Sequence, residues 1–117
     1  MSSSTETTGI ATIEVTSLNQ VRVTQRVKSV VGAVAWHVHN NTASNVKVCI
    51  NNFRPADAAQ EGSFQARFLL ENDHCTHSVT PDGIGVIHAI FSGKPKQILK
   101  YDVAVNGTIA TDPELEI

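Results

Sequence analysis

The sequence has little charge, and neither sign dominates. Lysine and arginine together number 9, and aspartate and glutamate number 11, so the formal net charge is -2 at pH 7. Proteins that bind nucleic acid or an anionic membrane carry a strongly basic face or segment. The charge balance therefore predicts no nucleic-acid partner and no electrostatic attachment to a membrane.

Long apolar segments are also missing, because no run approaches the ~20 residues that a membrane-spanning helix needs. The first eight residues are rich in Ser and Thr, and they lack both the basic start and the apolar centre of a secretion signal. We therefore expect residues 1–8 to form a flexible tail and residues 9–117 to form a single domain. We also expect the protein to be cytoplasmic.

Cysteines and aromatic residues are scarce. The two cysteines, Cys49 and Cys75, are too few for a disulfide framework, although one bridge between them is possible. In a reducing cytoplasm we expect both to be free thiols. Aromatic residues make up 5% of the chain, with a single tryptophan, Trp36. We expect Trp36 in the core, where it offers no surface for stacking a sugar.

Hydrophobic alternation with a period of two is the main pattern that is present. In residues 34–39, Val34, Trp36 and Val38 alternate with Ala35 and two histidines. Comparable runs occupy residues 10–15, 21–28, 46–51, 64–70, 85–91, 101–105 and 115–117. Turn residues separate them, as in Pro81-Asp82-Gly83 and Asn106-Gly107.

Short strands with turns at intervals of roughly ten residues favour a sandwich or barrel. The only helical candidate, residues 55–61, is too short to be stable alone. The pattern thus predicts an all-β fold, a Greek-key antiparallel β-sandwich of about eight strands. The expected core residues are Val23, Trp36, Val38, Val48, Ile50, Phe68, Ile90, Tyr101 and Val103.

Two parts of the chain resemble known families. In residues 34–42 a strand ends in Asn-x-Thr, and in residues 46–50 valine and isoleucine alternate, which is similar to cupredoxin-like and immunoglobulin-like domains. Residues 100–107 and 112–117 resemble the ends of small bacterial β-sandwich proteins of unassigned function. The resemblance implies a cupredoxin-like or immunoglobulin-like sandwich, and it implies no activity, since one fold hosts many functions.

A loop holds the denser of two candidate metal clusters. His74, Cys75 and His77 follow Asp73, so four donor side chains fall within five residues. Thiolate and imidazole ligands suit Zn²⁺ or copper. Cys75 and His77 also resemble the second half of a cupredoxin copper site, although the only methionine is Met1 and the axial ligand is missing. The alternative is a polar connection with incidental histidines.

A second candidate metal set lies on the strand of residues 34–39. His37 and His39 share one face of that strand. If residues 34–39 and 46–50 form an antiparallel hairpin with Trp36 and Val48 in one core, Cys49 joins the histidine face. Lys47 would then lie in the same patch and repel a cation. The alternative is a solvent-facing strand surface.

No motif points to catalysis. A nucleophile elbow, a phosphate-binding glycine loop and a zinc-protease helix are all absent from the sequence. Arg22, Arg26 and Lys28 share one face of a predicted strand, where they either bind an acidic partner or keep the strand soluble. His88 is expected in the core or at a subunit interface.

We therefore expect a non-enzymatic binding or structural module that acts on an unknown protein partner or by self-association. The alternative function is a cupredoxin-like metal-binding protein that uses the His/Cys loop. No other cofactor is expected.

Overall fold

The computed structural model describes residues 6–17, 20–56, 64–68, 74–93 and 96–117. Every regular element within these ranges is a β-strand, which confirms the all-β prediction. These ranges hold no helix with the length and apolarity to cross a membrane. The strands are β1 (Glu6–Thr8), β2 (Ile10–Ser17), β3 (Gln20–Val23), β4 (Arg26–Lys28), β5 (Ala33–Asn40), β6 (Val48–Pro55), β7 (Gln65–Phe68), β8 (Ile84–Ser92), β9 (Ile98–Val105), β10 (Thr108–Thr111) and β11 (Glu114–Glu116).

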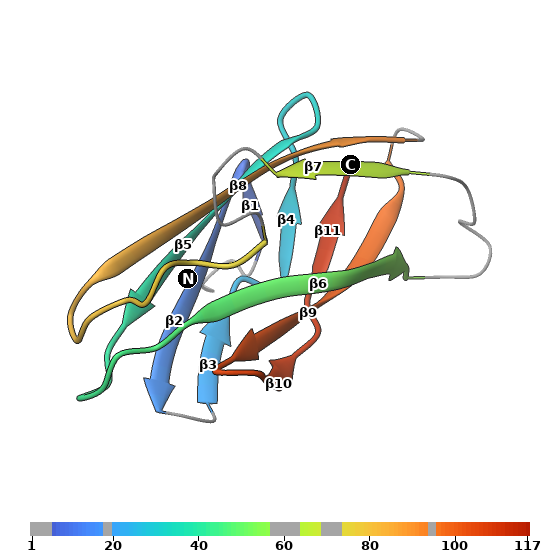
Figure 1. Ribbon diagram of the computed structural model, residues 1–117. Coiled ribbons are helices and arrows are strands. Elements are labelled where there is room, and N and C mark those ends of the chain that lie inside the picture. The colour runs from blue at the N-terminus through green and yellow to red at the C-terminus, as the bar shows by residue number, and fades with distance from the viewer. Residues whose placement is uncertain (1–5, 18–19, 57–63, 69–73, 94–95) are drawn as a thin grey trace, which may run out of the picture.

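The strands form two sheets (Figure 1). One sheet has the order β3-β2-β5-β8-β7, and the other has the order β1-β4-β11-β9-β10, with β6 also paired to β9. Both sheets are mixed, because β2 pairs with β5 in parallel and β4 pairs with both β1 and β11 in parallel. The predicted antiparallel sandwich is therefore confirmed only in part, because most of the strand pairs are antiparallel but these three are parallel. Side chains alternate in the same way in parallel and antiparallel strands, so the pattern alone cannot distinguish them.

The expected single strand over residues 21–28 is in fact two strands, β3 and β4, which lie in different sheets. Thr24 still donates its backbone N–H to Thr12 of β2, at 3.0 Å. The carbonyl of the next residue, Gln25, instead accepts from the N–H of Glu114 at the start of β11, at 2.9 Å. The chain thus passes from one sheet to the other between these two residues, as the succession of β3 and β4 in Figure 1 shows.

The start of the chain differs from the expected flexible tail of residues 1–8. Residues 6–8 form β1, which pairs in parallel with β4 and places Thr7 opposite Val27. This pairing uses backbone groups, so the Ser/Thr-rich sequence gave no alternating signal for it. The remaining tail residues, 1–5, lie outside the described part of the chain. So does most of the expected helical turn at residues 55–61, while Pro55 ends β6.

The expected hairpin between residues 34–39 and 46–50 does not form. β5 pairs with β2 and β8, whereas β6 belongs to the other sheet and pairs with β9. The side chain of Asn40, fully buried at the end of β5, fixes the turn between them. Its amide nitrogen donates to the carbonyls of Ser44 and Val79, and its carbonyl oxygen accepts from the N–H and hydroxyl of Thr42.

The core lies between the two sheets and contains side chains from both. Trp36 of β5 is fully buried, and its indole N–H donates to the hydroxyl of Tyr101 in β9 at 3.0 Å. The Trp36 ring also makes edge contacts with Phe53, Phe91 and Tyr101, at centroid distances of 6.5, 6.2 and 5.7 Å. The predicted core positions Trp36, Val38, Val48, Ile50, Tyr101 and Val103 are confirmed, and all are 0% exposed. Val23 and Phe68 are partly buried against this cluster.

One predicted core residue, Ile90 of β8, is wrong, because its side chain is 37% exposed. The core-facing residues of β8 are Ile87, Ala89 and Phe91, and Ile87 lies opposite Trp36. Apolar residues occupy both faces of β8, so alternation could not tell the inner face from the outer one. Pairing with β5 decides which face is buried.

Tyr101 gives the fold a pH dependence that can be measured directly. Burial raises the pKa of Tyr101 from 10.0 to about 12, and the hydrogen bond from Trp36 partly opposes this change. A raised phenol pKa means that the folded state favours the neutral form. The stabilisation is therefore complete below pH 10 and is lost as the pH rises toward 12.

Because Tyr101 is the only tyrosine, the ultraviolet absorbance of tyrosinate reports on this residue alone. We expect the native protein to titrate near pH 12, or to titrate as it unfolds in alkali. The same titration in denaturant is expected near pH 10. Titration of the native protein near pH 10 would contradict the burial of Tyr101.

Candidate functional site

The metal set predicted on the strand, His37, His39 and Cys49, is not brought together. His37 and His39 point to the outer face of the five-stranded sheet, since they alternate with the buried Trp36 and Val38. Their neighbours across the strands are Thr12 and Glu14 of β2 and Val86 and Ile84 of β8. Cys49 lies in β6 of the other sheet. The expected register fails because β5 and β6 face each other across the core.

The metal set predicted in the loop, His74, Cys75 and His77, lies in the segment that precedes β8. The ring of His74 packs edge-on against Phe68, at a centroid distance of 6.1 Å, and His77 is exposed. Asp73, the expected fourth donor, lies outside the described residues. Cys75 forms a disulfide with Cys49, so the expectation of free thiols is wrong. The two cysteines are 26 residues apart in sequence, and spacing alone could not show that strand pairing would make them neighbours.

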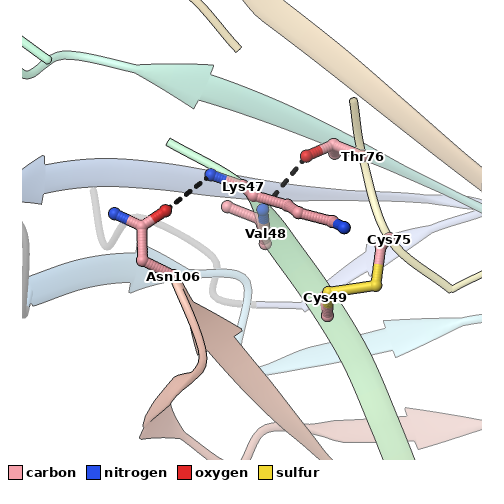
Figure 2. The surroundings of a disulfide bond; sticks show 6 residues. All are labelled: Lys47, Val48, Cys49, Cys75, Thr76 and Asn106. Carbon is pink, nitrogen blue, oxygen red and sulfur yellow. Dashed lines mark hydrogen bonds between the residues drawn. A yellow bond between two sulfur atoms is a disulfide. The ribbon is translucent and has the colours of Figure 1, made fainter. Parts of the chain in front are cut away.

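The disulfide joins β6 to an antiparallel segment at its edge (Figure 2). Cys49 and Cys75 lie directly opposite each other, with their Cα atoms 4.0 Å apart. Backbone hydrogen bonds flank the pair, from Ile50 N–H to the His74 carbonyl and from Thr76 N–H to the Val48 carbonyl, both 2.8 Å long. The hydroxyl of Thr76 accepts a further bond from the Val48 N–H at 3.0 Å, as Figure 2 shows.

While the disulfide is intact, neither predicted metal cluster can use its cysteine as a ligand. A cysteine binds a metal as a thiolate, and both sulfur atoms are occupied by the disulfide. Within the described ranges, no three His, Cys, Asp or Glu side chains are grouped so that they could hold a metal ion. The disulfide links one cysteine from each of the two predicted metal clusters. Zn²⁺ or copper binding stays a prediction, and any role for Cys49 or Cys75 in it requires that the disulfide first be reduced.

The outer face of the five-stranded sheet carries a second candidate site. Ile10, Ile84 and Ile90 are 47%, 63% and 37% exposed there, and Ala35 and the half-buried His88 lie among them. Beside these residues, the turn between β4 and β5 exposes two valines. We call this surface the apolar face, and it comprises Ile10, Val30, Val31, Ala35, Ile84, His88 and Ile90.

The turn beside the apolar face has an unusual backbone. Val30 and Ala33 exchange two backbone hydrogen bonds of 3.0 and 2.9 Å around Val31 and Gly32. Both central residues have positive φ, 51° and 84°, which suits glycine but is strained for a β-branched valine. Val31 is nevertheless 98% exposed. Strain combined with full exposure of an apolar side chain indicates a role outside the fold.

A hollow of about 430 Å³ lies where this turn meets the sheet. Its walls include Ile10, Val30 and Ala35, and His88 contributes an imidazole. The sequence interpretation placed His88 in the core or at a subunit interface, and the structure places it half-buried on the outer face. The apolar face was missed because it combines β2, β5, β8 and a turn. The apolar residues on both sides of β8 were the one available signal.

The outer face of the six-stranded sheet has a different character, because its described side chains form five ion pairs. The ion pairs are Arg26–Glu114 at 2.6 Å, Lys28–Glu116 at 3.9 Å, Arg54–Asp102 at 3.1 Å, Arg54–Asp112 at 3.6 Å and Lys100–Asp112 at 3.7 Å. Arg22 lies on the other sheet beside Glu14, at 3.7 Å. Of the three basic residues predicted to share one face, Arg26 and Lys28 do share one in β4, whereas Arg22 lies in the other sheet, and each of the three has an acidic neighbour.

Comparison with known proteins adds no precedent for either candidate site. No protein-family model matches the chain, and the search of curated proteins finds no match.

Proposed function

We propose that this chain is a non-enzymatic binding module that acts through the apolar face. One observation carries the proposal. Of the six large hydrophobic side chains that are exposed among the described residues, five belong to this face, and only Ile109 lies elsewhere. Scattered exposed hydrophobics are ordinary, but a contiguous group of them marks an interaction surface.

A second copy of the chain is the partner that this surface fits best. The charged residues on the outer side of the five-stranded sheet lie toward its ends, with Glu14 beside Arg22 at one end and Arg67 opposite Ile90 at the other. Between them the central positions are apolar residues, threonine and histidine. Around Ile10, Ala35 and His88 two copies can therefore pack face to face without burying a charged group, which would be costly, while Ile84 and Ile90 lie beside the charged ends of the sheet.

Paired substitutions separate this face from general surface hydrophobicity. Ile84→Asp places a charge on the apolar face, and Ile109→Asp makes the same change at a position of nearly equal exposure, 62% against 63%. We expect the wild-type protein and Ile109→Asp to self-associate, and Ile84→Asp to weaken association about ten-fold or more, since a buried unpaired charge opposes binding. Sedimentation velocity over a concentration series measures this.

Two results would contradict self-association through the apolar face. Wild-type protein that remains monomeric over the whole series would exclude the second copy as partner. Equal association of all three proteins would show that the apolar face is not the contact. Far-ultraviolet circular dichroism of each variant confirms that folding is unchanged.

We further propose that the two sheets form a Greek-key sandwich of the cupredoxin-like type. The shared core supports a sandwich, since Trp36 of one sheet contacts Tyr101 of the other. The parallel pairs β2–β5 and β4–β11 favour the cupredoxin-like alternative, because immunoglobulin-like sheets are antiparallel. An experimentally determined structure of the protein tests this assignment.

The disulfide also provides an indication of the cellular compartment in which the protein acts. Cytosolic thiols are kept reduced, so a disulfide between Cys49 and Cys75 favours an oxidising compartment over the expected cytoplasm. We therefore propose an oxidising location, which cell fractionation with thiol trapping tests.

A further inference from the structure

We propose that the Cys49–Cys75 disulfide is a reversible thiol–disulfide exchange site that reacts in the folded protein, and that Lys47 assists the exchange. The reacting partner is a dithiol, such as the paired thiols of a protein reductant. This site is separate from the apolar face, so the proposal does not depend on the proposed function.

The disulfide is accessible to an attacking thiolate. Cys49 sits between Val48 and Ile50, which are both fully buried, so its own side chain points away from the core. Cys49 and Cys75 are each half-buried, and the exposed Lys47 and His77 lie two residues from them. A structural disulfide inside a core is shielded from attack, whereas this one lies at the surface of a sheet edge.

Lys47 places a positive charge near the disulfide (Figure 2). Lys47 lies just before β6, two residues from Cys49, and both residues alternate with the buried Val46 and Val48, so their side chains share one outward face. In Figure 2 the Lys47 side chain extends toward Cys75. The backbone of Lys47 is fixed on its other side, where its N–H donates to the Asn106 side chain at 2.9 Å and its carbonyl accepts from the Asn106 N–H at 2.8 Å. An ammonium group beside a disulfide attracts the attacking thiolate and stabilises the departing one.

The backbone pairing is irregular next to the disulfide. Between the pairs Cys49–Cys75 and Val46–Val79, the chain entering β6 contributes two residues and the opposing segment contributes three. The extra residue is a bulge, a feature that occurs at sheet edges and next to reactive sites. It interrupts the backbone ladder beside the disulfide and leaves His77 exposed.

The exchange balances as two displacements. One thiolate of the dithiol attacks a sulfur of the disulfide, the S–S bond breaks, and the other cysteine leaves as a thiolate. The second thiolate of the reductant then attacks the mixed disulfide, forms the reductant's own disulfide and releases the remaining cysteine. In total the protein gains two electrons and two protons, and the dithiol loses them.

The fold retains other contacts when the bond opens. The hydrogen bonds of Ile50 and Thr76 to the opposing segment do not involve sulfur, and neither does the two-way backbone pairing of Val46 with Val79 at 3.0 and 2.7 Å. We therefore expect the reduced protein to remain folded, so that the bond can form again when an oxidant is added.

Dithiothreitol is the probe, with thiols trapped by alkylation and counted by mass spectrometry. We expect reduction at a rate that does not change across low urea concentrations, because no unfolding is needed. The circular dichroism spectrum should remain that of a β-protein, and oxidised glutathione should restore the bond. A rate that rises with urea in parallel with unfolding would overturn the proposal, as would failure to reoxidise.

A charge reversal tests the role of Lys47 separately. Lys47→Glu is expected to slow reduction by dithiothreitol about five-fold, and high salt should diminish the difference. Lys96→Glu carries the same charge change at the exposed turn before β9, and it is expected to react like the wild type. Equal rates for all three proteins would overturn the assignment of Lys47. Equal slowing in both variants would show a net-charge effect and would also overturn it.

Discussion

Replacement of Trp36 by alanine is expected to lower the free energy of unfolding by about 3–5 kcal/mol. The indole is fully buried between the sheets and contacts three aromatic rings. Its removal leaves a cavity and takes the hydrogen-bond donor away from the buried Tyr101 hydroxyl. Urea unfolding should be followed by circular dichroism, because the variant lacks the only tryptophan and its fluorescence cannot serve.

Two milder variants separate the contributions of volume and hydrogen bonding. Trp36→Phe keeps an aromatic ring, so it should cost less than the alanine change. Tyr101→Phe keeps nearly all the volume but leaves the indole N–H without its acceptor, at a cost of about 1–3 kcal/mol. A loss below about 1 kcal/mol for Trp36→Ala would show that the indole is not in the core.

Removal of the disulfide by the double substitution Cys49→Ser and Cys75→Ser is expected to cost about 3 kcal/mol. The bond closes a loop between residues 26 apart, and its loss gives the unfolded chain more conformational freedom. Urea unfolding of the oxidised wild-type protein and the variant, without reductant, measures the difference.

Reductant supplies the matching control. Dithiothreitol should bring the wild-type protein close to the stability of the double variant and leave the variant itself unchanged. Equal stability of untreated wild type and variant would mean that the disulfide is absent or does not restrain the unfolded chain. This stability result is independent of the exchange rate, since a bond can stabilise the fold whether or not it reacts quickly.

The two partners of the disulfide illustrate how far the candidate sites could be predicted. The sequence identified Cys49 and Cys75 as chemically interesting, but it assigned them to different clusters. Neither its hydrophobic pattern nor its spacing could show that residues 74–76 would lie against β6. That neighbourhood depends on long-range pairing, in which residue 49 meets both residue 75 and, on the other side, residue 104.

The sequence by itself determined the strand class and most of the core. A period of two requires strands, and it correctly placed Trp36, Val38, Val48 and Ile50 inside, because alternate side chains of a strand face opposite sides. Local chemistry also determined the Asn106-Gly107 turn. Both residues have positive φ, 50° and 88°, which asparagine and glycine tolerate.

Only the tertiary structure decided which strands pair, and therefore which surfaces carry the candidate sites. Apolar and polar residues alternate along β5 and β6 in the same way whether the two strands form a hairpin or face each other across a core. β8 is apolar on both sides, so its outer face became visible only when Ile87 was placed opposite Trp36. The apolar face and the disulfide both arise from contacts between distant segments, and such contacts depend on the packing of the whole chain rather than on the periodicity of any one segment.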